Sequence, residues 1–127
     1  AVATPTPLGR QRRGATGAAA ARHLAEVEVL LTAFRADARA GAVDRDVAEW
    51  ARDLLGTTRL LIDSPAGDDA RLRRLLGDLE LVLAQIARLP ARSAPDDEVQ
   101  IIDEAVRQRD VIARVRSALP AGARAGS

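Results

Sequence analysis

The chain has 127 residues, of which 47% are hydrophobic but only 2% aromatic, and its 19 basic and 18 acidic side chains give a formal net charge of +1. One domain is expected at this length, and a core of Leu, Val, Ile and Ala favours closely packed helices over a β-sandwich. The balanced charge disfavours a nucleic-acid-binding protein, which needs a basic face, and the absence of cysteine excludes disulfides and thiolate metal sites.

The beginning of the chain is predicted to be a disordered linker. Residues 1–15 combine Pro5 and Pro7 with arginines and glycines, and they show no apolar period. No run of about 18 apolar residues exists, so no segment is expected to span a bilayer. The chain begins at Ala1 and contains no methionine, which leaves room for a removed signal peptide, membrane anchor or other N-terminal region.

Two helices joined by a short link are predicted next. The first begins near Thr16 or Ala18 and ends at Ala40, before Gly41, and Asp44 can cap the second. Because the link is so short, the two helices are expected to be antiparallel. The predicted seam residues follow steps of three and four in both helices, at Leu24, Val27, Leu31, Phe34 and Ala38 and then at Val43, Val47, Trp50, Leu54, Thr57 or Thr58, and Leu61.

The third predicted helix, from Asp68 to Leu89, is the most apolar, and a turn-forming link at residues 63–67 precedes it. The acidic pair Asp68 and Asp69 is expected to cap its start. Its apolar face is predicted at Leu72, Leu75, Leu76, Leu79, Val82, Leu83, Ile86 and Leu89. The fourth helix is expected from Asp96 to about Leu119. Three polar residues, 108–110, interrupt its apolar pattern, and a kink, a polar layer in the core or a more exposed helix would each explain them. Its predicted seam is Ile101, Ala105, Gln108, Ile112, Val115 and Leu119, flanked by Ile102, Val106 and Val111.

These elements predict an all-α protein. We expect an antiparallel four-helix bundle, made of two packed helical hairpins, over residues 16–120, with the disordered tail at 1–15 and a flexible tail at 121–127. Oppositely charged residues four positions apart are expected to support exposed helix faces, as in Asp103 with Arg107 and Asp110 with Arg114.

No motif predicts catalysis, a cofactor or a metal. His23 is the only histidine, and we expect it at the surface or at the boundary of the core. A helical metal site needs several His and Glu ligands, a P-loop needs a lysine that the chain lacks, and serine catalysis needs a correctly placed base. The carboxylates on the last two helices, Asp78, Glu80, Asp103 and Glu104, are expected to lie on solvated faces. Thr57 and Thr58 lie beside the apolar stripes, and their hydroxyls are expected to hydrogen-bond back to their own helix.

Apolar residues outside the predicted seams are the strongest functional signal. Such residues are either buried inside the bundle or contact another protein, and self-association is the simplest form of the second alternative. The interaction candidates are Leu60, Ile62, Leu81, Val29 and Leu30.

Two stretches carry a resemblance to a known family. They are residues 52–65, RDLLGTTRLLIDSP, and residues 76–86, LGDLELVLAQI. Together they resemble the C-terminal, post-membrane region of anti-sigma factors from G+C-rich bacteria, over roughly residues 18–120. In that family a cytoplasmic segment holds a sigma factor, a membrane helix follows, and a helical sensor domain lies outside the inner membrane.

This chain departs from the family in two ways. The His and Cys residues of a zinc-binding anti-sigma domain are absent, so the resemblance covers the sensor part only. Arg10, Arg12 and Arg13 in the spacer run against the positive-inside tendency.

The resemblance and the apolar surplus lead to one functional expectation. It is a non-enzymatic, periplasmic or otherwise extracytoplasmic helical sensor or protein-interaction domain, tethered to or associated with a membrane through a region outside this chain. We expect a protein partner or self-association, no nucleic acid and no cofactor. The alternative is a membrane-extrinsic stabilising subunit of a larger membrane protein assembly.

Overall fold

The computed structural model describes residues 7–89 and 96–119, and these residues form helices and no strand. The helices are α1 (Pro7–Ala40), α2 (Arg45–Ile62), α3 (Ala70–Ala87), α4 (Asp96–Gln108) and α5 (Val111–Ala118), with a short 3-10 helix, η1 (Pro65–Asp68), between α2 and α3. The prediction of an all-α protein is confirmed over this part of the chain. No helix within it combines the length and the apolar composition needed to cross a membrane.

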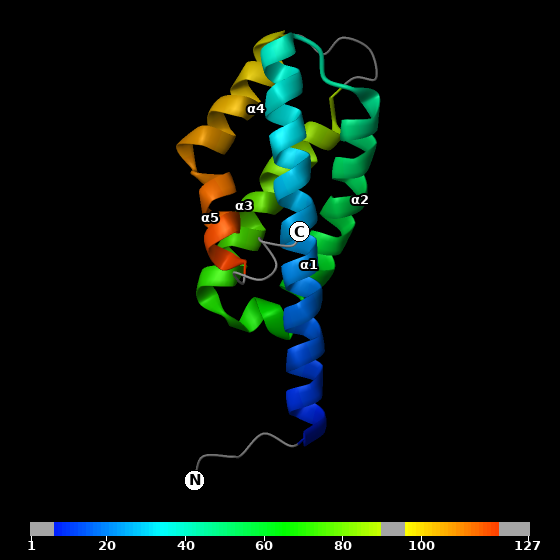
Figure 1. The fold of residues 1–127 in the computed structure, drawn as a ribbon, viewed down its shortest axis with the longest axis vertical. Coiled ribbons are helices and arrows are strands. Elements are labelled where there is room, and N and C mark those ends of the chain that lie inside the picture. The colour runs from blue at the N-terminus through cyan, green and yellow to red at the C-terminus, as the bar shows by residue number, and fades with distance from the viewer. Residues whose placement is uncertain (1–6, 90–95, 120–127) are drawn as a thin grey trace.

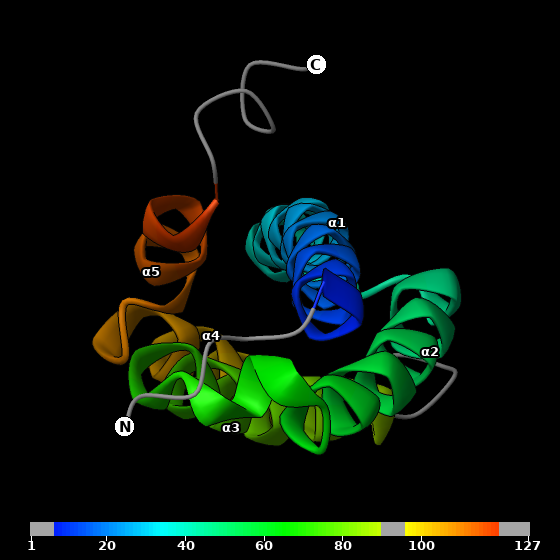
Figure 2. The same cartoon turned by 90° about the horizontal axis from the view of Figure 1, so that it is seen from below.

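The helices form a ring around one core (Figures 1 and 2). α1 packs against α2 on one side and against α5 on the other, while α3 packs against α2 and against both α4 and α5. The most extensive packing is between α2 and α3. Figure 2 shows α1 and α3 on opposite sides of the ring, so the apolar stripes of all the helices meet between them.

The predicted fourth helix is divided into α4 and α5, which corrects the expectation of four helices. The break lies at Asp110, whose backbone is left-handed with φ 53° and ψ 39°. The buried residues of α4 end at Val106 and those of α5 begin five positions later, at Val111. A continuous helix would turn these two valines to different sides, so the break restores the core-facing direction.

The break also decides between the three explanations of the polar interruption. Gln108, Arg109 and Asp110 are all exposed, so they form a bend at the surface and not a polar layer in the core. The predicted seam of this segment is partly wrong, because Ile101 is 63% exposed and the residues expected to flank the seam, Ile102 and Val106, are buried.

The first helix begins at Pro7, within the segment expected to be a disordered linker. Proline suits the first turn of a helix, where its missing N–H has no intrahelical partner. The part of α1 near its N-terminus extends beyond the other helices (Figure 1), and Ala20 is its first buried residue among those whose burial is described. Residues 1–6 and the predicted tail at 121–127 lie outside the described residues.

Local signals read from the sequence place the C-terminal end of α1 and both ends of α2 correctly, whereas α3 is two residues shorter at each end than predicted. The Asp44 carboxylate accepts a hydrogen bond from the Asp46 N–H at 2.9 Å, and the Asp69 carboxylate accepts from the N–H groups of Arg71 and Leu72. Gly41 has the left-handed φ of 84° that favours glycine after a helix. The expected seams of the first three helices face the core, where Phe34 and Leu79 are fully buried, although Val43, Trp50 and Leu72 are only partly buried.

Candidate interaction site

The five predicted interaction residues do not share one environment. Leu60, Leu81 and Val29 are exposed, with 73%, 54% and 58% of their surface accessible. Leu30 is fully buried in the core, so it is not available to a partner, and Ile62 is half-buried against the core. Val29 and Leu30 differ because neighbouring positions on a helix point about 100° apart.

The two exposed leucines lie in similar surroundings on α2 and α3. Leu60 follows Gly56 by one helical turn, and Leu81 follows Gly77 by the same interval, so each leucine shares a side of its helix with a glycine. A Cβ placed on either glycine would meet no neighbouring atom within 4 Å. We call the surface made by Gly56, Leu60, Gly77 and Leu81 the outer face of α2 and α3.

Contacts between α2 and α3 set the height of these residues along the helix pair. Arg59 donates to the Glu80 carboxylate at 3.1 Å, and Arg52 donates to the Ala87 carbonyl at 3.2 Å. Both contacts fit one antiparallel register of α2 and α3. This register places Leu60 and Leu81 at nearly the same level along the two helix axes. The glycines were visible in the sequence, but only the structure reveals that both have open space beside them.

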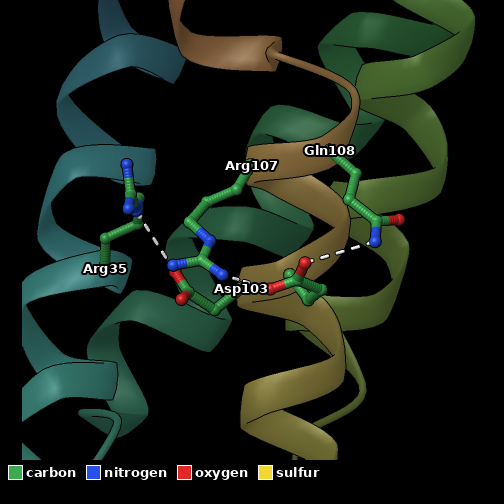
Figure 3. Close-up of polar contacts among 5 residues, drawn as sticks. Arg35, Asp103, Arg107 and Gln108 are labelled. Atoms are coloured by element: carbon green, nitrogen blue, oxygen red, sulfur yellow. Dashed lines mark hydrogen bonds and ion pairs between the residues drawn. The ribbon is translucent and has the colours of Figure 1, made fainter.

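Ion pairs join α4 and α5 to the rest of the molecule. Arg35 of α1 donates to Asp103 of α4 at 3.2 Å (Figure 3), and Arg116 of α5 donates to Glu28 of α1 at 2.6 Å. On α4 itself Glu104 accepts from both Arg107 and Gln108. The predicted pair of Asp103 with Arg107 is therefore wrong, because Asp103 turns to the neighbouring helix.

Asp78 of α3 holds the bend between α4 and α5. Its two carboxylate oxygens lie 2.6 Å from Arg114 and 3.5 Å from Arg109, one arginine on each side of Asp110. The predicted pair of Asp110 with Arg114 is replaced by this contact. Asp78 and Asp103 keep only 25% and 16% of their side-chain surface exposed, so their role is to join helices and the expectation of solvated faces is wrong for them.

His23 was expected at the surface or the boundary, and that expectation is wrong. Only 4% of the residue is exposed, and its Nε2 lies 2.6 Å from the Thr58 hydroxyl. Thr58 donates its single proton to the Leu54 carbonyl at 2.8 Å, which is the back-bond predicted for it, so Nε2–H of His23 is the donor to Thr58. Burial lowers the pKa of His23 from 6.5 to about 4, so the side chain is neutral at pH 7.

Across the described residues, no three His, Cys, Asp or Glu side chains are placed to hold a metal ion together. No protein-family model, curated protein or solved structure matches the chain. The arrangement of side chains is therefore the basis for the functional argument.

Proposed function

We propose that the chain is a non-enzymatic helical domain that binds a protein through the outer face of α2 and α3. One observation carries the proposal. Two leucines are left in water, and each stands one turn from a glycine inside a helix that has no steric need for glycine within this chain.

The energetic cost of this arrangement supports a contact outside the chain. Glycine inside a helix is about 1 kcal/mol less favourable than alanine, and the surrounding atoms leave room for a methyl group at both Gly56 and Gly77. A glycine on a helix surface lets another backbone approach closely, and a leucine one turn away can fill a depression in the partner. The closely packed α2 and α3 provide a rigid platform for such a contact.

A second copy of this chain is the partner that fits best. The two helices carry matching segments, Gly-Thr-Thr-Arg-Leu at 56–60 and Gly-Asp-Leu-Glu-Leu at 77–81. A two-fold axis parallel to the helices would bring α2 of one copy opposite α3 of the other. Arg59, which pairs with Glu80 of its own chain, would then also lie near Glu80 of the second copy, and the interface would be self-complementary in charge.

The test is the solution mass by light-scattering chromatography across a concentration series. We expect wild-type protein to form a dimer and the double variant Leu60→Ser/Leu81→Ser to stay monomeric at the same concentrations, with unchanged circular dichroism because both side chains are exposed. Val29→Ser is the matched control, since it removes an equally exposed apolar side chain from α1. A wild-type monomer at every concentration, or an equal effect of the control, would contradict the proposal.

We further propose that the domain is the extracytoplasmic sensor part of a membrane-tethered anti-sigma factor. The resemblance of residues 52–65 and 76–86 supports this, and so does the extension of α1 toward its N-terminus, which could link the helical body to a tether. In this proposal α4 and α5 together serve as the fourth leg of an antiparallel bundle of two hairpins. A signal would change the packing of these hairpins or the dimer contact, and α1 would transmit the change.

Fractionation and co-purification of the full-length gene product test this setting. We expect it in the membrane fraction, with a sigma factor bound to its cytoplasmic part. Absence from the membrane would overturn the tether, and a stable stoichiometric complex without any sigma factor would favour a subunit of a membrane assembly instead. Neither outcome would affect the interface test, which uses the present chain alone.

A further inference from the structure

A groove of about 740 Å³ lies between the N-terminal half of α3 and the C-terminal half of α5. Its volume falls in the range of about 300 to 1,000 Å³ that is common for small-molecule sites. The walls come from two helices that are not consecutive in the chain, and α3 supplies most of the lining side chains. The groove lies away from the outer face of α2 and α3, because none of the four residues of that face lines it.

Arginines dominate the charge of the groove. Arg71, Arg74 and Arg114 line it, and the only acidic side chain in the lining is Asp69. The Asp69 carboxylate is already engaged by the backbone N–H groups at the start of α3. Arg114 is paired with Asp78, but within the described residues neither Arg71 nor Arg74 forms an ion pair.

The remaining lining is apolar or small. Leu72 lies between Arg71 and Arg74 in sequence, Leu75 follows Arg74, and Ser117 and Ala118 form part of the opposite wall. Leu75 is buried and Leu72 half-buried, so the groove reaches down to the edge of the core. A ligand that matches both features needs an anionic head and an apolar body, and a guanidinium group binds a carboxylate through two parallel hydrogen bonds.

We propose that this groove binds a long-chain carboxylate, with its head between Arg71 and Arg74 and its alkyl chain along Leu72 and Leu75. The proposal goes beyond the protein-interaction role and does not depend on it. Arg114 gives the site a connection to the rest of the fold, since the same side chain contacts Asp78 and the Arg109 carbonyl at the bend between α4 and α5.

Isothermal titration calorimetry with dodecanoate, below its micellar concentration, tests the proposal on the whole chain. We expect saturable binding with one site per chain. Dodecanol, which lacks the charge, and acetate, which lacks the alkyl chain, are each expected to bind at least about tenfold more weakly, because each loses one of the two complementary contacts.

Charge-matched variants locate the site. Arg71→Gln/Arg74→Gln should weaken dodecanoate binding by about tenfold or more, since each arginine removed eliminates a charge-assisted hydrogen bond. Arg73→Gln/Arg88→Gln removes the same charge from exposed positions of the same segment outside the groove, and its affinity should stay within about twofold of the wild type. No saturable binding, equal binding of dodecanol, or equal losses in the two double variants would overturn the proposal.

Discussion

His23 and Thr58 form a buried polar contact between α1 and α2. A neutral imidazole satisfies this contact by donating from Nε2, and burial disfavours the charged form. The side chain therefore acts as a structural residue whose protonation opposes folding. The sequence around His23, between Arg22 and Leu24, did not predict its burial. The 3.6-residue period of the helix places His23 at the edge of the apolar stripe and not at its middle.

The free energy of unfolding should depend on His23 in mildly acidic solution. The folded-state pKa is lowered to about 4 from the unfolded value of 6.5, so between these values the unfolded chain binds more protons. The contribution of a neutral His23 is complete above pH 6.5 and is lost as the pH falls toward 4, by up to about 3 kcal/mol. Urea unfolding at several pH values measures it. His23→Gln is the control, and a variant with the same pH dependence as the wild type would contradict the prediction.

At the scale of elements, the bend between α4 and α5 depends on a contact with another helix. Asp110 adopts a left-handed backbone without a side-chain capping bond, and aspartate tolerates this conformation better than most residues but less well than glycine. Asp78 of α3 compensates by holding an arginine on each side of the bend. The bend is thus specified jointly by the local polar run and by a carboxylate 32 positions earlier in the chain.

Asp78→Asn should loosen α5 more than an equivalent change elsewhere on α3. It removes the charge that two arginines share at a site that is only a quarter exposed, so we expect a loss of about 1 kcal/mol. Glu80→Gln, which affects one more exposed pair with Arg59, should cost less than about 0.5 kcal/mol. Urea unfolding gives both values, and amide hydrogen exchange should be faster in α5 only for Asp78→Asn. Equal losses would refute the special role of Asp78.

For the whole molecule, the first part of α1 extends beyond the other helices (Figure 1). Gly17 and Ala18 are exposed, and Ala20 is the first buried residue among those whose burial is described. Helix formation in this part therefore rests on continuation from the packed part of α1 and on local propensity, since elongating an existing helix avoids the cost of nucleation.

Deleting residues 1–17 should leave the body folded. We expect the free energy of unfolding to change by less than about 0.5 kcal/mol, because Gly14 and Gly17 are exposed and Ala20 is the first buried residue among those whose burial is described. A longer deletion through Leu24 should cost several kcal/mol, since it also removes Ala20, His23 and Leu24 from the interior. Thermal and urea unfolding followed by circular dichroism compare the two. Loss of cooperative unfolding in the shorter deletion would show that the extension supports the body.

The sequence by itself determined the all-α class, the core stripes of the first three helices and the caps at Asp44 and Asp69. These features depend on periodicity and on bonds within a few residues, so they are independent of how distant segments meet. The same local rules left the exposed Leu60 and the buried Leu30 indistinguishable, since both are apolar residues near a stripe.

Only the tertiary structure decided which surplus residues face water, how the fourth predicted helix divides and which charges pair. Asp103 and Asp78 pair with arginines on other helices and not with arginines one turn away on their own helix. A partly buried ion pair between helices is screened less by water than a pair on one exposed helix face. His23 likewise is a core residue because α2 packs Thr58 against it. Each of these outcomes depends on the distance between segments remote in sequence, which periodicity does not encode.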